Sequence, residues 1–188
     1  MPRNGVQQGA VMFEIKQWNP ETYRRQTRRS TLIIALIFVL LAVTLSSVAV
    51  MLFGEADGDN FRLNLGGVIA GLVLSVALVR IKFWSQAWMA PAIYGWQLKR
   101  SLMSITNIMH YVTAGVQAGE PTAMKLLRFY HLGLTQMHQL DGNSSALGQM
   151  TREIEQHKEN MLAQAIDTEQ YRLNPAWLEA VKKFGAEK

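Results

Sequence analysis

The sequence predicts an all-α protein, in which a two-helix transmembrane hairpin is followed by a small antiparallel helical bundle. Three observations predict this fold: a charge-free apolar run over residues 31–53, a second apolar run over 61–83, and apolar residues at helical spacing further on. No segment alternates apolar and polar residues as strands do. The expected parts are a mobile N-terminal segment (1–18), the hairpin with a juxtamembrane helix (19–90) and a cytoplasmic helical domain (91–188).

The first apolar run, Thr31 to Phe53, has the length and composition of a membrane span. As a helix it extends about 34 Å, and the hydrocarbon core of a bilayer is about 30 Å thick. A secretory signal peptide is one alternative, but its apolar core is only about 7–15 residues long. A core helix of a soluble protein is the other, and such helices seldom run this far without a charged residue. We therefore expect an anchor that stays in the membrane.

Small residues follow one face of the second run. Gly67, Gly71 and Ser75 are spaced four residues apart, and small side chains let two membrane helices approach closely. Two partners fit this helix-packing face. It can pack against Ala42 and Ser46 of the first run, to which it is tethered, or against a second copy of the chain, which would make the protein a homo-oligomer.

Basic residues set the expected orientation in the membrane. Lys and Arg are in excess before the first run and after the second, whereas the loop over 54–60 is acidic. An excess of Lys and Arg marks the cytoplasmic side. We therefore expect both termini in the cytoplasm, and in a bacterium the membrane is the inner membrane. The residues assigned to membrane orientation and to contact with anionic lipid are Arg24, Arg25, Arg28, Arg29, Arg80 and Lys82.

The formal charge of +5 does not indicate a nucleic-acid partner. The basic residues gather beside the two apolar runs, where membrane lipids are the expected partner, and those of the distal part are offset by acidic residues. The chain has no cysteine, which excludes disulfides, zinc–thiolate sites and thiol chemistry. The sequence leaves Met1 and Met12 as alternative native starts.

Helix-start signals recur along the chain. Asn19-Pro20, Glu120-Pro121 and Asn174-Pro175 each place a residue that can cap a helix before a proline. Proline is favoured in the first turn because its missing N–H has no partner there anyway. We therefore expect helices to begin at these three positions.

The signals divide the distal part into four expected helices. The first runs from Ala92 to a cap at Gly119, the second covers 121–140, the third begins at Asn143, and a short helix closes the chain. Short connections make consecutive helices antiparallel neighbours. The expected apolar seams are Leu98, Leu102, Ile105, Met109, Val112 and Val116; Leu127, Tyr130, Leu134 and Met137; Leu147, Met150, Ile154 and Met161; and Trp177, Leu178, Val181 and Phe184.

Histidines supply the candidates for a polar or metal site. His131 and His138 are seven residues apart and share a helix face, while His157 lies in the third seam with Glu153 one turn before it. One interpretation is a buried polar network, in which His157 bonds Glu153 or Tyr130 and fixes the packing. The other is a metal or proton site assembled from different helices.

These patterns name no reaction. The paired Glu-x-x-His motifs of di-iron bundles and the Gly-rich loops that hold phosphates are both missing, so we assign no catalytic residue, metal or cofactor. The expected function is that of a non-enzymatic inner-membrane protein whose cytoplasmic helical domain mediates protein–protein interaction or self-association with an unidentified partner. The alternative is a small membrane-anchored helical enzyme or metal-binding sensor that uses the histidine cluster.

Three stretches of the sequence are distinctive: PETYRRQTRRSTLIIA, YGWQLKRSL and TAMKLLRFYHLGLTQMHQLDGNSSAL. Through them the chain resembles an uncharacterised family of small gammaproteobacterial inner-membrane proteins, catalogued only as a domain of unknown function. The resemblance runs from about Met12 to Trp177 and implies a Gram-negative inner membrane. It transfers no catalytic residue.

Overall fold

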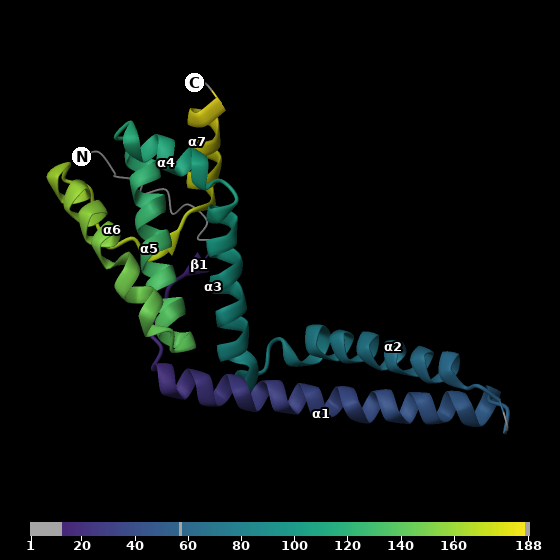
Figure 1. Cartoon of the computed structure of the whole chain (residues 1–188). Helices are drawn as coiled ribbons and strands as arrows, with labels where there is room; N and C mark the ends of the chain where they lie inside the picture. The colour runs from purple at the N-terminus through teal and green to yellow at the C-terminus, as the bar shows by residue number, and fades with distance from the viewer. Residues whose placement is uncertain (1–12, 57, 187–188) are drawn as a thin grey trace, which may run out of the picture. The chain divides into compact units, whose positions relative to one another are not determined.

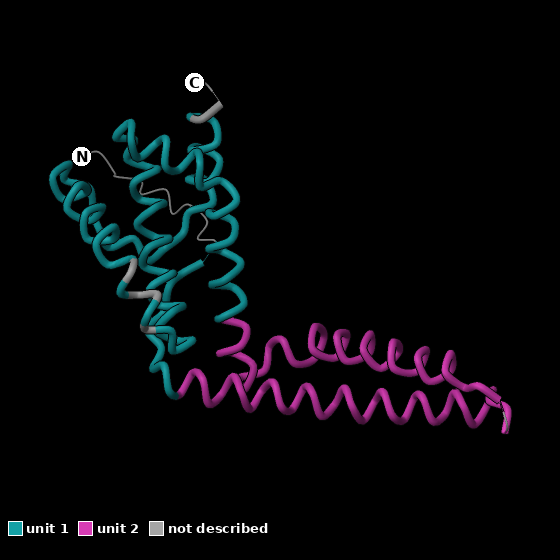
Figure 2. Tube along the Cα trace, viewed as in Figure 1, with its two compact units in different colours: residues 1–21, 95–188 teal, residues 22–94 magenta. Residues whose placement is uncertain are grey.

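The computed structural model describes residues 13–56 and 58–186. The first part of the segment expected to be mobile and both alternative starts, Met1 and Met12, lie outside the described residues. The chain divides into two compact units, one of residues 22–94 and the other of residues 1–21 and 95–188 (Figure 2).

The unit of residues 22–94 is a helical hairpin. Helix α1 (Pro20–Phe53) is followed by α2 (Phe61–Leu78), which continues as a π-helical turn, η1 (Val79–Phe83) (Figure 1). A short 3₁₀ turn, η2 (Ala87–Met89), closes the unit. Both α1 and the stretch Phe61–Phe83 are long and apolar enough to cross a membrane.

The apolar side chains of the hairpin are exposed rather than buried. Only 6% of the most apolar window of α1 lies inside the protein, and only 17% of that of the second span. Leu32, Met51 and Phe53 are 70%, 78% and 74% exposed. A core helix of a soluble protein would bury such side chains, because leaving them in water is unfavourable by about 25 cal/mol per Å².

The small-residue face of α2 lies against α1 of the same chain. A Cβ atom added at Gly67 would lie 2.4 Å from the Cα of Ser46, and one added at Gly71 would lie 2.8 Å from the Cα of Ala42. Ser75, the third member of the face, is buried. The hydroxyl of Ser46 also donates to the Asn64 carbonyl of α2, at 2.9 Å. Of the two partners expected for this face, the structure contains the one within the chain.

The second unit is a helical bundle. It contains α3 (Ala90–Thr106) from Gly95 onward, and all of α4 (Met109–Gln117), α5 (Pro121–Asp141), α6 (Ser144–Ala163) and α7 (Pro175–Ala186) (Figure 1). Helix α5 packs against α4, α6 and α7, and α4 also packs against α7. Two long apolar helices followed by a helical bundle confirm the predicted all-α fold.

Local chemistry explains most helix ends. Helices α1, α5 and α7 begin at the prolines of the three predicted start signals. The Glu120 carboxylate accepts from the Ala123 amide at 2.6 Å and so caps the first turn of α5. Gly119 and Gly142 follow α4 and α5 with φ of +73° and +75°, a conformation that glycine adopts without strain.

The single helix expected from Ala92 to Gly119 is wrong. The structure breaks it between Thr106 and Met109, giving α3 and α4. Ile108 takes a φ of −118°, and its amide donates to the Ile105 carbonyl three residues back, at 3.0 Å. Ile108 is also buried, so the turn places an apolar side chain in the core that a straight helix would leave elsewhere.

The apolar seam expected along α5 is also wrong. Leu127, Tyr130, Leu134 and Met137 are only half-buried. The fully buried apolar residues of α5 are Ala123, Met124, Leu126, Phe129 and Leu140. Because α5 packs against three other helices, more than one of its faces is covered, and a single stripe does not describe its buried surface.

A short two-stranded sheet was not predicted. Strand β1 (Phe13–Glu14) pairs antiparallel with β2 (Arg172–Leu173), with Phe13 opposite Leu173. Strands of two residues are too short to show an alternating pattern. Phe13, Ile15 and Leu173 are buried, and the Gln136 side-chain amide donates to the Lys16 carbonyl. Part of the segment expected to be mobile therefore packs on the bundle.

Candidate functional site

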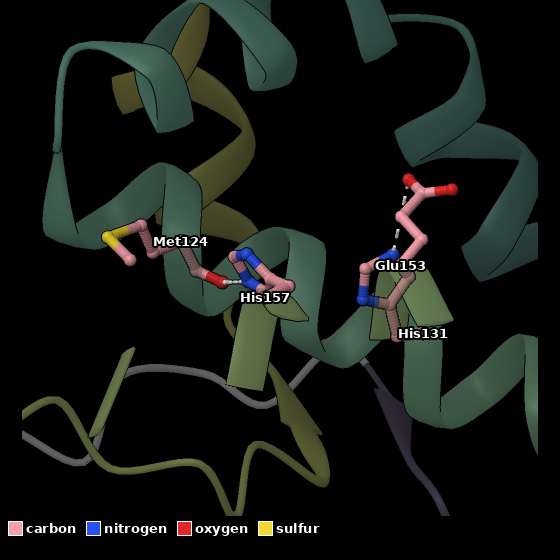
Figure 3. Close-up of polar contacts among 4 residues, drawn as sticks. All are labelled: Met124, His131, Glu153 and His157. Atoms are coloured by element: carbon pink, nitrogen blue, oxygen red, sulfur yellow. Dashed lines mark hydrogen bonds and ion pairs between the residues drawn. The ribbon is translucent and has the colours of Figure 1, made fainter. Parts of the chain in front are cut away.

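A groove of about 800 Å³ lies among helices α4, α5 and α6. Its lining includes His131 of α5 and both Glu153 and His157 of α6, three of the four residues of the expected cluster (Figure 3). Thr113 and Gln117 of α4 also line the groove, as do the apolar side chains Met109, Val116 and Leu127. The groove therefore combines apolar walls with several hydrogen-bonding groups.

His157 is held by the backbone of α5. Its Nε2 atom lies 2.9 Å from the carbonyl oxygen of Met124, and the side chain is buried (Figure 3). A carbonyl can only accept, so Nε2 carries the proton and Nδ1 is left as an acceptor. The hydrogen bond that the structure gives to His157 is thus to the Met124 carbonyl, whereas the expected partner was Glu153 or Tyr130. Burial lowers the pKa of His157, against opposing effects of the Met124 bond and the Glu153 charge.

His131 is buried and poorly partnered. Its Nδ1 atom has no hydrogen-bond partner among the described residues, and the residue is only 1% exposed. Its Nε2 atom lies 3.9 Å from the Glu153 carboxylate, which is too far for a hydrogen bond. A buried polar atom left without a partner is unfavourable by about 1–3 kcal/mol. Such an atom is unusual in a native core, which makes His131 a candidate functional residue.

The protonation state of His131 determines whether its contact with Glu153 is an ion pair. Burial, together with the nearby His157 and Arg128, lowers the pKa of His131 from 6.5 to about 4. The ring is therefore neutral at physiological pH, and the 3.9 Å contact with Glu153 is not an ion pair there. Below that pKa the ring would gain a charge facing an exposed carboxylate.

The two buried histidine rings lie side by side. Their centroids are 5.3 Å apart and their planes meet at 82°. His138 does not belong to this pair: it is half-buried and lies two turns, or about 10 Å, further along α5. Across residues 13–56 and 58–186, no group of three or more His, Cys, Asp or Glu side chains is arranged to hold a metal ion.

Arg128 influences both rings of the histidine pair, although it was not among the residues predicted for the histidine cluster. It is buried on α5, and its Nε atom donates to the Thr168 carbonyl at 3.0 Å. Its charge contributes to the lowered pKa of both His131 and His157. Its position three residues before His131 places both on one helix face, which is the signal that could have identified it.

The residues assigned to orientation and lipid contact lie in the hairpin. Arg25, Arg28 and Arg29 are exposed on the early turns of α1, where Arg24 is half-buried. Arg80 and Lys82 are exposed on η1, where the second apolar stretch ends, near the early turns of α1. All six residues therefore border the apolar stretches of the hairpin.

Comparison with protein families gives a match over residues 13–178, to the family described as protein of unknown function (DUF3087). The chain belongs to this family. Comparison with curated proteins and with solved structures found no match. Membership of DUF3087 brings no assigned activity, so the roles of residues rest on the structure of this family member.

The groove of this DUF3087 protein offers both hydrogen-bonding groups and apolar walls. Both rings are neutral at physiological pH, and the Nε2 proton of His157 is committed to a backbone carbonyl. The polar side chains Gln117, Gln156 and Asn160 offer hydrogen bonds to an occupant. The apolar contacts come from Met109, Val116 and Leu127 of the same groove.

Proposed function

We propose that this protein is anchored in the inner membrane of a Gram-negative bacterium by its helical hairpin, with both termini in the cytoplasm. The observation that carries the proposal is the exposure of the hairpin's apolar side chains, with 6% and 17% of the two most apolar windows buried. In water this surface would be strongly unfavourable, whereas in a bilayer it meets lipid tails.

The packing between α1 and α2 supports a permanent membrane anchor rather than a cleaved signal sequence. A signal sequence is removed from the mature protein and needs no fitted partner helix. Here Gly67 and Gly71 leave no room for a side chain beside α1, and Ser46 bonds the backbone of α2. Such close helix–helix contact is how spans associate within a membrane.

The orientation follows from charge. Exposed arginines precede the apolar part of α1, and Arg80 and Lys82 end the second span, whereas Glu55 and Asp59 lie in the connection between the helices. The positive-inside rule then places the connection in the periplasm and the helical bundle in the cytoplasm.

For the bundle we propose a non-enzymatic role in binding a protein partner through the α4–α5–α6 groove. The groove combines apolar walls with hydrogen-bonding side chains, as the contact surfaces between proteins do. The unpartnered Nδ1 atom of His131 lies beside it and marks where the bundle is not optimised for its own stability.

A matched pair of substitutions tests the binding role. Thr113 and Thr151 are both exposed, but only Thr113 lines the groove. Cross-linking in native membranes, followed by mass measurement of the tagged protein, should give a discrete adduct for the wild type and for Thr151→Arg. Thr113→Arg should lose the adduct, because a long charged side chain fills the groove. Equal adducts in both variants would contradict the proposal.

One observation favours a metal-binding sensor as a second candidate function. The two neutral histidine rings lie 5.3 Å apart, and neutral imidazole is a common metal ligand. Metal analysis of the detergent-purified full chain tests this candidate. A stoichiometric metal that disappears in both His131→Leu and His157→Leu would favour it over the binding role.

A further inference from the structure

The hairpin carries a second groove, of about 290 Å³, between α1 and α2. Its walls come from Ile34 and Phe38 of α1 and from Leu72, Val76 and Val79 of α2 and η1. Ser75 also lines it, but its hydroxyl donates to the Gly71 carbonyl at 2.8 Å and is therefore satisfied within its own helix. The groove thus offers an occupant apolar contacts along its length.

A cation stands at one end of this groove. Arg80 lines it, and its guanidinium carbon lies 4.7 Å above the centre of the Trp84 ring. The side chain is exposed, and none of the acidic side chains in the described part of the chain forms an ion pair with it. Stacking on Trp84 occupies one face of the guanidinium and leaves its N–H edge available to an anion.

The direction of the groove matches that of a lipid. From Val79 to Leu72 it runs about 10 Å along α2, away from Arg80 and towards the middle of the apolar helix. In the proposed orientation Arg80 and Trp84 lie at the cytoplasmic interface, where head groups are found, and the apolar end lies in the hydrocarbon. Basic pockets between membrane helices on the cytoplasmic side are known binding places for anionic head groups.

We propose that this groove binds an anionic phospholipid, with the phosphate on Arg80 and an acyl chain between α1 and α2. The proposal rests on the membrane anchoring proposed above. A free phosphate would use Arg80 alone, whereas the apolar walls give a phospholipid additional contact. Phosphatidylglycerol, which carries one negative charge, is a suitable probe.

Native mass spectrometry of the full chain in a non-ionic detergent measures lipid binding directly. The wild type should bind phosphatidylglycerol more tightly than phosphatidylcholine. Arg80→Gln should weaken binding of phosphatidylglycerol by about five- to tenfold, the change expected for one lost basic contact. It should weaken that of phosphatidylcholine less, because the choline cation offsets the charge of its phosphate. Val76→Trp, which fills the groove, should weaken binding of both lipids.

Arg100 provides a matched control. Its guanidinium carbon lies 5.1 Å above the Trp96 ring, a similar stacking to that of Arg80, but Arg100 does not line the groove. Arg100→Gln should therefore retain the preference for phosphatidylglycerol. An equal loss in both variants would mean general attraction to basic surface and would overturn the proposal. Displacement of the lipid by glycerol phosphate alone would also overturn it.

Resistance to alkaline carbonate extraction separates this proposal from the anchoring on which it rests. If the wild type is extracted from membranes, the anchoring itself fails. If the wild type and Arg80→Gln both stay in the membrane but neither prefers phosphatidylglycerol, only the lipid site fails. The expected result is that both stay in the membrane and differ in lipid preference.

Discussion

Acidification is expected to destabilise the helical bundle through His131. Burial, aided by His157 and Arg128, lowers the pKa of this ring from 6.5 to about 4. Between these two values the unfolded chain binds a proton that the folded chain does not, so a falling pH favours unfolding. The full effect is about 3 kcal/mol of unfolding free energy, of which about 2 kcal/mol is lost by about pH 5.

A His131→Leu variant isolates this contribution. Leucine cannot take up a proton, and it replaces a buried nitrogen that has no partner among the described residues. Between about pH 7.5 and about pH 5, the free energy of unfolding of this variant should fall about 2 kcal/mol less than that of the wild type. Urea unfolding of the full chain in detergent, followed by far-UV circular dichroism, measures the difference.

His138→Leu is the matched control, because His138 lies on the same helix but outside the histidine pair. It should keep the pH response of the wild type. His157 contributes in the same direction as His131, since burial also lowers its pKa, and this part remains in both variants. Equal pH responses of the wild type and His131→Leu would refute the reasoning.

Three further substitutions, two of them with a matched control, test the packing. Gly71→Ile should lower the melting temperature and leave the oligomer mass unchanged, because its Cβ would lie 2.8 Å from the α1 backbone. The control Gly66→Ile, whose Cβ would have nothing within 4 Å, should change neither quantity. A lower mass of Gly71→Ile in light scattering would instead indicate pairing between chains. Arg128→Met should lower the free energy of unfolding in urea by about 2–3 kcal/mol, because it removes a buried hydrogen-bond donor. The control Arg172→Met, at an exposed ion pair, should lower it by less than about 1 kcal/mol. His157→Leu should stay within about 1 kcal/mol of the wild type, and loss of a bound metal in this variant would contradict its structural role.

Those parts of the fold that depend on local chemistry could be predicted from the sequence. Prolines after capping residues locate the starts of α1, α5 and α7, and Gly142 ends α5 in the left-handed conformation that its turn requires. The hairpin could be predicted because a long charge-free run seldom occurs outside membrane-spanning helices.

Long-range contacts explain the failures. The break at Ile108 and the pairing of Phe13 with Leu173 depend on where apolar side chains find a core, which no local pattern records. The same holds for the site. The sequence indicated that His131 and His157 could meet, but the acceptor of His157 is the backbone of Met124, a group that every residue carries.

The topology of the hairpin is the most direct test of the central claim. Alkaline phosphatase, which is active only in the periplasm, can be fused at Gly58 between the two apolar helices and at Lys188 after the bundle. Anchoring with both termini in the cytoplasm predicts activity at Gly58 and none at Lys188. Activity at Lys188 with none at Gly58 would contradict the orientation, and inactivity at both positions would contradict the membrane hairpin itself.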